Sequence, residues 1–264
     1  MQITGLLDDE HAEVSSIVST LETDPALAAR VLRLANSAAF GGRAHIDTLG
    51  HAVMRLGAHR LKTLLFLSHV LVQFSTGDDE RFDFARFWRH SLLTACMARA
   101  AARQRRHYDA DALLALGLLH DIGKAIMCDH SPETFARVSQ AYSTGEMPFY
   151  AAEVACLGVH HGHVGYWAFR RWGFPDSFGQ TALRHHQPGK MPLAAIRDKH
   201  AIFTVHLANI AAHRFLDDGR CDEPDEQAAL VTGMSVDDVA EVAEDALAEA
   251  TAIAESMKLP MTTD

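Results

Sequence analysis

A histidine and an aspartate stand side by side at positions 120 and 121, at the end of an apolar helical run. Imidazole nitrogens and carboxylate oxygens are both common ligands of divalent metal ions. Gly123 and Lys124 follow directly, and an ammonium group three residues beyond the aspartate could meet an anionic phosphate. The run therefore suggests a metal site with Lys124 as a phosphate contact.

A structural interpretation accounts for the same residues. His120 and Asp121 can serve as hydrogen-bonded polar groups in a buried helix. Gly123 can end that helix, with Lys124 near its negative end. The pair alone leaves both interpretations open.

Other histidines favour a metal site. The chain has seventeen, and six besides His120 fall where predicted helices begin or end: His90, His160, His161, His163, His185 and His186. Several helix ends that each present an imidazole can converge on one metal-sized volume. The other ten, among them His206 and His213, are scattered, and we interpret nearly all of them as surface or capping groups.

The elements that position these residues are predicted to be helices nearly throughout. Apolar residues recur at spacings of three and four, and alternating runs that would indicate strands are scarce. Breaks are expected at Gly57, at residues 75–81 and in an exposed acidic loop at residues 217–227. Helices are expected over residues 26–40, 48–57, 58–74, 84–104, 109–119, 132–144, about 153–160, 162–172, 175–186 and 194–215, and from Ser235 onward.

Composition limits the classes of function. The chain has 264 residues, enough for one large or two smaller domains, and a formal net charge of −10, which argues against a sequence-independent grip on nucleic acid. Its four cysteines form no CxxC pair, so a zinc knuckle or redox dithiol is not expected.

The first residues lack a basic signal segment, and the longest apolar stretch, Leu64 to Phe74, is too short to span a membrane. We expect a cytoplasmic protein that does not bind membranes.

A DNA-binding alternative rests on residues 48–57 and the helix that follows, which could form a helix-turn-helix. The second of these helices is mostly Leu, Phe and Val, whereas a recognition helix needs polar side chains to read base edges. We therefore expect no nucleic-acid partner.

The site residues, taken in order, resemble the HD superfamily of metal-dependent phosphohydrolases, which have an all-helical core. The similarity is closer to the HDOD family, a relative of the HD-GYP proteins that hydrolyse cyclic dinucleotides. It covers about residues 10–215 and is carried by residues 24–37, Leu56-Gly57, Phe87-Trp88-Arg89-His90-Ser91, residues 117–124, and His185-His186 followed by Pro188.

The resemblance implies an all-α, multi-helix bundle with an N-terminal helical lobe at 1–75, an HD-like helical core at 76–216, and an acidic loop with a C-terminal helix at 217–264. It also implies one or two divalent ions of the Fe, Mn or Zn class. The implied metal ligands are His90, His120, Asp121, His161, His185 and His186. In an enzyme, Asp121 and Lys124 would be the catalytic residues.

Two departures from the HD enzymes affect the expected function. Asn209 stands where an HD enzyme would place a late aspartate, and a neutral amide is a poorer ligand for a hard cation. The GYP signature is also missing after the histidine pair. HDOD proteins are generally regarded as signalling modules without demonstrated catalysis, so the resemblance implies a bacterial regulatory protein.

The leading hypothesis is therefore binding without catalysis. The chain would bind a signalling protein on a separate chain, such as a receiver, kinase or cyclase, or a nucleotide-like small ligand. The alternative is a metal-dependent phosphohydrolase acting on a cyclic dinucleotide or another phosphoester. Asn36 and Ser37, late in the first predicted helix, would cap its end or meet a partner, and capping is the simpler role.

Overall fold

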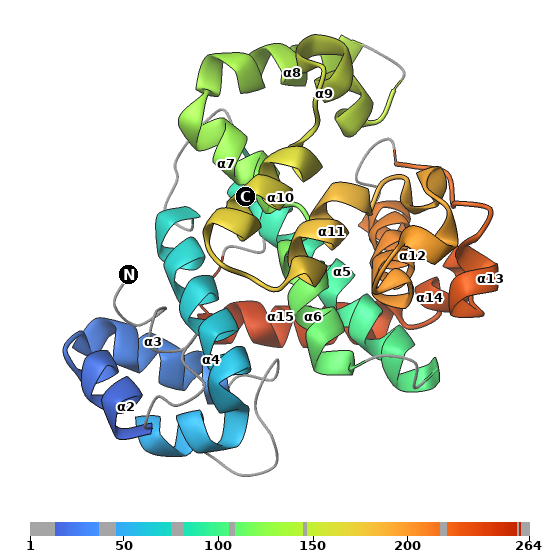
Figure 1. The fold of residues 1–264 in the computed structure, drawn as a ribbon. Coiled ribbons are helices and arrows are strands. Elements are labelled where there is room, and N and C mark those ends of the chain that lie inside the picture. The colour runs from blue at the N-terminus through green and yellow to red at the C-terminus, as the bar shows by residue number, and fades with distance from the viewer. Residues whose placement is uncertain are drawn as a thin grey trace. The chain divides into compact units, whose positions relative to one another are not determined.

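Every regular element in the part of the chain that the structure describes is a helix, as the spacing of apolar residues predicts (Figure 1). The computed structural model describes residues 14–36, 46–74, 82–105, 109–144, 147–216, 221–257 and 259. None of the helices in these ranges is long and apolar enough to cross a membrane. The predicted break at residues 75–81 and the end of the first predicted helix at residues 37–40 lie outside the described residues.

The chain divides into two compact units. The first contains residues 1–78 and 251–261, and the second contains residues 79–250 and 262–264. Helix α15 (Ala243–Met257) contributes its first turns to the second unit and its last turns to the first. The three-part division into residues 1–75, 76–216 and 217–264 stays a prediction.

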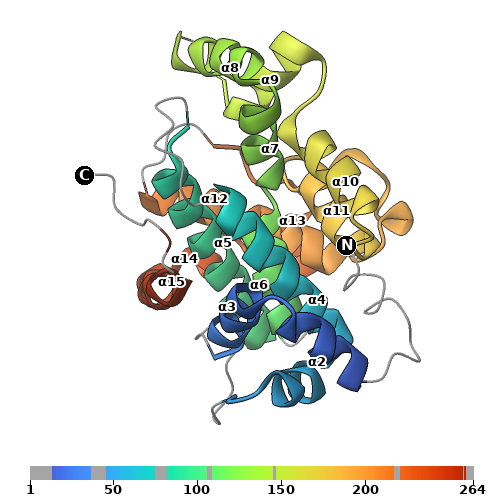
Figure 2. The ribbon, with the colours of Figure 1, turned by 90° about the vertical axis from the view of Figure 1, so that its left-hand side faces the viewer.

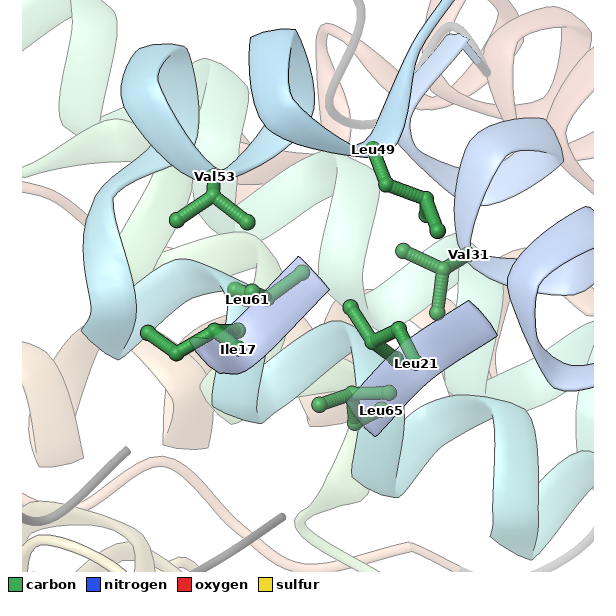
Figure 3. Packing of buried hydrophobic residues seen from close by; sticks show 7 residues of the cluster. All are labelled: Ile17, Leu21, Val31, Leu49, Val53, Leu61 and Leu65. Atoms are coloured by element: carbon green, nitrogen blue, oxygen red, sulfur yellow. The ribbon is translucent and has the colours of Figure 1, made fainter. Parts of the chain in front are cut away.

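The first unit is built on helices α2 (Val14–Glu22), α3 (Pro25–Asn36) and α4 (Leu49–Phe74). Asp24 caps α3, because its Oδ1 accepts the amides of Ala26 and Leu27, each at 3.0 Å. Gly57, at φ 73°, separates α4 into two helical parts. Apolar side chains from all three helices pack together in Figure 3, namely Ile17, Leu21, Val31, Leu49, Val53, Leu61 and Leu65.

Asn36 joins the end of α3 to Ile46. Its Oδ1 accepts the amide of Ile46 at 2.8 Å, and its Nδ2 donates to the carbonyl oxygens of Leu32 and Ile46 at 2.9 and 2.8 Å. The side chain therefore ends the helix and clamps both backbone groups of a residue ten positions away. Of the two roles considered for Asn36, the structure supports capping; Ser37 lies outside the described residues.

Replacing Asn36 by alanine is expected to destabilise the first unit by about 2 kcal/mol, because three partly buried hydrogen bonds are lost. Asn36→Asp keeps the acceptor for the Ile46 amide but removes both donors, so it should also destabilise. Chemical denaturation monitored by circular dichroism measures the effect. Wild-type stability in both variants would contradict the clamp.

The second unit carries the remaining helices. Helices α5, α6 and α12 pack together, and α10 and α11 form a second close pair. In both views α7 leads to α8 and α9 at one end of this unit (Figures 1 and 2). The bounds are α5 (Phe84–Arg105), α6 (Ala110–Leu119), α7 (Ile122–His130), α8 (Pro132–Thr144), α9 (Phe149–Leu157), α10 (His161–Arg171), α11 (Asp176–Arg184), α12 (Lys199–Leu216), α13 (Ala228–Thr232) and α14 (Val236–Ala240), with short 3₁₀ turns at Pro188–Lys190 and Leu193–Ala195.

Several helices differ from the prediction: α7 and α13 were not expected, α9 spans residues 149–157 and not about 153–160, and three further differences concern the packing of the second unit. The helix expected from residue 194 begins at Lys199, because residues 193–195 form a 3₁₀ turn. The helix expected from Ser235 is broken at residues 241–242. Its first part, α14, packs on α12, whereas α15 brings Glu249 to the buried Arg99 of α5, and the break lets the chain change direction between these contacts.

The third difference concerns Gly123, which lies inside α7 and does not end a helix. A Cβ atom at Gly123 would lie 2.0 Å from the carbonyl oxygen of His161. The glycine is therefore needed for the close approach of α7 to the start of α10, a tertiary contact that no local pattern reveals.

Candidate metal centre

The turn between α6 and α7 holds the His-Asp pair. His120 follows the last residue of α6, and Asp121 precedes the first residue of α7. Nδ1 of His120 donates to the carbonyl oxygen of Gly117 at 2.6 Å. A Cβ atom at Gly117 would lie 2.7 Å from Cα of Ala95, so this glycine lets α6 pack tightly against α5. Both polar side chains are buried.

His161 is the first residue of α10, and Glu153 of α9 fixes it twice. Oε2 of Glu153 accepts the backbone amide of His161 at 2.9 Å and its Nδ1 at 2.6 Å. Both side chains are fully buried. His160 and His163, also singled out from the sequence, form the capping box at the start of α10. These two histidines therefore help to begin the helix that carries His161.

His185 and His186 follow the end of α11. Nδ1 of His185 donates to the carbonyl oxygen of Ala182 at 2.8 Å, and Nδ1 of His186 donates to Oδ2 of Asp222 at 2.6 Å. A Cβ atom at Gly162 would lie 2.3 Å from the Ala182 oxygen, so a second glycine permits the close pairing of α10 and α11.

The imidazole Nε2 atoms converge on Asp121. Oδ1 of Asp121 is 2.9 Å from Nε2 of His161 and 3.3 Å from Nε2 of His185, and Oδ2 is 3.4 Å from Nε2 of His120. Nε2 of His161 is 2.9 Å from Nε2 of His186 and 3.5 Å from Nε2 of His185. One ligand atom from each of Asp121, His161, His185 and His186 lies within 4.8 Å of the others.

This geometry fits a cation. When His161, His185 and His186 are neutral and donate through Nδ1, each Nε2 carries a lone pair, and a cation between these nitrogens would relieve the repulsion of the lone pairs. Two nitrogens on one tetrahedral zinc ion, with bonds of about 2.0 Å, stand about 3.3 Å apart, which the observed separations of 2.9 and 3.5 Å bracket. Nε2 of His120 is also buried without a hydrogen-bond partner among the described residues.

A second possible ligand group, His90, His120 and Asp121, shares Asp121 with the first. His90 lies in α5 and is buried. Its Nε2 is 2.8 Å from Oδ1 of Asn209, on α12, so this imidazole donates to the neutral amide. Its ring also contacts the ring of His213, with centroids 4.1 Å apart. The expectation that Asn209 lies at the site therefore agrees with the geometry.

The protonation states suit metal binding. Burial lowers the pKa of His90 to about 3 and of His120 to about 4, so both imidazoles are neutral at pH 7. Burial alone would raise the pKa of Asp121, but the charges of His120, Lys124 and His161 lower it well below its ordinary value. Burial also opposes protonation of His161, but Glu153 and Asp121 raise its pKa. The cluster thus combines an ionised Asp121 with neutral imidazoles at His90 and His120, whereas His161 must release a proton to bind a metal through Nε2.

Lys124 lies in the first turn of α7, and its ammonium group contacts the cluster. Nζ is 2.5 Å from Oδ2 of Asp121 and lies over the ring of Phe149, 5.7 Å from the centroid. In this structure the lysine therefore neutralises the carboxylate, and it lines the adjacent cavity, where it could contact an anion.

A cavity of about 250 Å³ opens beside the cluster in the second unit. Its lining includes His90, Asp121, Lys124 and His186 from the cluster. Aromatic side chains supply much of its wall: Phe82, Phe87, Phe135, Tyr142, Phe149 and Tyr150. A small molecule with an anionic group and an apolar or aromatic body suits such a lining.

Sequence reasoning missed several groups that support the cluster. Glu153 had a signal, as the one charged residue within the apolar helix α9. Asp222 had none, because it lies in the acidic loop predicted to be exposed; it is in fact buried against His186.

His206 and His213 were interpreted as surface or capping groups. This interpretation is wrong for His206: it is buried, and its Nδ1 donates to the carbonyl oxygen of His185 at 2.6 Å. It is also wrong for His213, whose ring contacts that of His90 and which lines the cavity.

Comparison with known sequences identifies the family. The pattern of the HDOD domain matches residues 1–188. The chain belongs to the HDOD family. A protein of Treponema pallidum (strain Nichols), described as uncharacterized, is 27% identical to this HDOD chain over 219 residues, which are 82% of this chain and 41% of that protein. The chain thus spans about two fifths of the length of this relative.

Solved structures share the HDOD fold. An HDOD domain protein of unknown function from Geobacter sulfurreducens superposes with a TM-score of 0.73 at 23% identity, covering 97% of this chain and 90% of that one. A protein of Shewanella amazonensis SB2B, provisionally described as a phosphohydrolase, gives 0.72 at 23%, with 97% and 91% covered. One of Marinobacter aquaeolei VT8, provisionally described as a signal transduction protein, gives 0.68 at 18%, with 97% and 58% covered.

Proposed function

We propose that this chain is a signalling protein whose second unit binds one or two divalent metal ions of the Fe, Mn or Zn class. The single observation that carries the proposal is the convergence of imidazole Nε2 atoms on Asp121. An oxygen atom accepts the Nδ1 proton of each of His120, His161, His185 and His186. That arrangement fixes the tautomer that leaves Nε2 free to bind a metal.

The adjacent cavity supports a small ligand as the signal. An anionic group would sit near Lys124 and the metal, and an apolar or aromatic body would lie against the aromatic wall. A nucleotide-like molecule has this combination of groups. The response would pass to a receiver, kinase or cyclase on a separate chain.

Asn209 and Lys124 favour binding over catalysis. Asn209 offers His90 a neutral oxygen, so the second ligand group has one negative charge fewer than it would with an aspartate. Lys124 neutralises Asp121, the carboxylate that would otherwise be a candidate base for water. Both features weaken the activation of a metal-bound nucleophile.

Metal content tests the proposal directly. Protein purified without a histidine tag or added metal is expected to contain at least one transition-metal ion per chain, measured by mass spectrometry. If the ion is lost in purification, Mn²⁺, Fe²⁺ or Zn²⁺ should rebind in anaerobic titrations and raise the melting temperature. A chain that binds none of the three would contradict the proposal.

A phosphohydrolase is the second candidate, and the cavity beside the cluster favours it. In that case the metal-loaded wild type would hydrolyse a cyclic dinucleotide or a simple phosphoester such as p-nitrophenyl phosphate. We expect the metal-loaded wild type to show no turnover above that of the Asp121→Asn variant.

Asn209→Asp places a carboxylate beside His90 and should tighten Mn²⁺ binding about tenfold. Unchanged binding in Asn209→Asp would show that this residue does not influence the ion.

A further inference from the structure

Residues 221–227, which we call the clasp, lie between α12 and α13. They are hydrogen-bonded directly to His186, and to His185 through His206. Residues 217–227 were predicted to form an exposed loop; residues 221–227 follow the path of a loop, but Asp222 is only 7% exposed. The clasp also lies beyond residues 1–188, the part of the chain that matches the HDOD pattern. Its role is therefore not implied by that match.

The first contact joins the clasp to His186 by a hydrogen bond. Oδ2 of Asp222 accepts the Nδ1 proton of His186 at 2.6 Å, and both side chains are buried. The ring of Tyr150 stacks on the same imidazole, with centroids 4.3 Å apart and planes 18° apart. The carboxylate and the tyrosine ring fix the position of His186, and the carboxylate also fixes its tautomer, with Nε2 facing His161.

The second contact joins the clasp to His185 through hydrogen bonds of His206. The backbone amide of Asp225 donates to Nε2 of His206 at 2.9 Å, and Nδ1 of His206 donates to the carbonyl oxygen of His185 at 2.6 Å. Oδ2 of Asp225 also accepts the amide of Gly189 at 2.9 Å. A Cβ atom at Gly189 would lie 2.4 Å from that carboxylate oxygen, so the clasp packs directly on the chain after the histidine pair.

We propose that Asp222 is a positioning residue for the metal ligand His186, and that metal binding and closure of the clasp stabilise each other. This inference rests on the proposed metal binding and deepens it by naming how the site is regulated. A metal on Nε2 makes the Nδ1 proton of His186 a stronger donor, so the bond to Asp222 strengthens. By linkage, the closed clasp must then raise metal affinity by the same factor.

The coupling connects the metal site to the surface of the protein. Cys221 and Asp222 line the cavity beside the cluster, so the position of the clasp also sets the shape of that cavity. Glu223, the next residue, has a side chain that is 93% exposed. A change at the ion is therefore transmitted over one or two residues to a surface that a partner protein can contact.

The test compares Asp222→Asn with Glu223→Gln in the full chain, using Mn²⁺ alone as the probe. Asp222→Asn keeps the shape of the side chain but replaces the carboxylate by a neutral amide, and is expected to weaken Mn²⁺ binding about 10- to 100-fold in calorimetric titrations. Glu223→Gln makes the same carboxylate-to-amide change at the exposed neighbour and should bind like the wild type. Melting temperatures without metal show whether either variant is misfolded.

Hydrogen exchange provides a second measurement, made on the wild type and on Asp222→Asn. Saturating Mn²⁺ is expected to slow exchange of the amides in residues 221–227, and this effect should be lost in Asp222→Asn even when that variant is saturated with Mn²⁺. Equal affinity in Asp222→Asn and wild type, or clasp exchange that Mn²⁺ does not change, would overturn the inference and leave the proposed metal function standing. A wild type that binds no metal would overturn both.

Discussion

Replacing Gly123 by alanine is expected to abolish metal binding and to destabilise the second unit by about 3 kcal/mol or more. The new Cβ would lie 2.0 Å from the carbonyl oxygen of His161, 2.8 Å from its carbonyl carbon and 3.0 Å from the amide nitrogen of Gly165. All three are backbone atoms, so a side-chain rotation cannot relieve the clash. The start of α10 must move away from α7, and His161 must move with it.

The displacement acts directly on the candidate ligands. Nε2 of His161 is 2.9 Å from Asp121 and 2.9 Å from His186, and a shift of about 1 Å exceeds the tolerance of metal–ligand bonds. Denaturant unfolding measures the stability, and Mn²⁺ or Zn²⁺ titration measures the affinity.

Gly50→Ala is the matched control for this variant. Gly50 is also helical, and a Cβ atom there would meet no atom within 4 Å. Alanine at this position should be neutral or should stabilise the protein by up to about 1 kcal/mol, because it has the higher helix propensity. Similar behaviour of the two variants would show that close packing at Gly123 does not position His161.

Replacing Asp121 by asparagine is expected to lower metal affinity by at least about 100-fold. The carboxylate is shared by both ligand groups and is the common neighbour of three imidazole Nε2 atoms. An amide of the same shape keeps one oxygen but loses the charge that attracts a cation. Among the described residues no other carboxylate lies in these two groups, and Glu153, which forms a third group with His160 and His161, is already bonded to Nδ1 of His161.

The same substitution should also lower the stability of the metal-free protein, by about 1–3 kcal/mol. Lys124, whose side chain is 14% exposed, would lose the partner of its ammonium group. Calorimetric titration separates the loss of affinity from the loss of stability, which is measured by metal-free thermal unfolding. Asp129→Asn removes an equal charge from an exposed carboxylate of α7 and should change neither quantity appreciably. Undiminished metal binding in Asp121→Asn would contradict the central role of this carboxylate.

Local chemistry made much of the fold predictable from sequence. Asp24 before Pro25 sets the start of α3 through bonds to its own neighbouring amides, and the glycine at position 57 marks the separation within α4. Apolar spacing identifies the helical faces because burial follows the helical period. The order His90, His120-Asp121, His161, His185-His186 is likewise a property of the sequence, as is the similarity to the HDOD family.

Tertiary structure decided which groups support those residues. Glu153 and Asp222 are 8 and 36 positions from the histidines that they orient, and Asp222 comes from a loop whose acidic composition predicts exposure. A carboxylate becomes a buried hydrogen-bond acceptor only when another segment presents a donor to it, and local composition cannot specify that segment. For the same reason His206 and His213 could not be distinguished from surface histidines.

Gly123 shows the same division. Its sequence context favours a helix end, because glycine is common there and a lysine follows. In the structure it lies within α7, where the absence of a Cβ lets the backbone of His161 approach. The sequence by itself determined the types and order of the candidate ligands; only the packing of α7, α10 and α11 decided that their nitrogens meet at one carboxylate, because that distance depends on contacts between segments far apart in the chain.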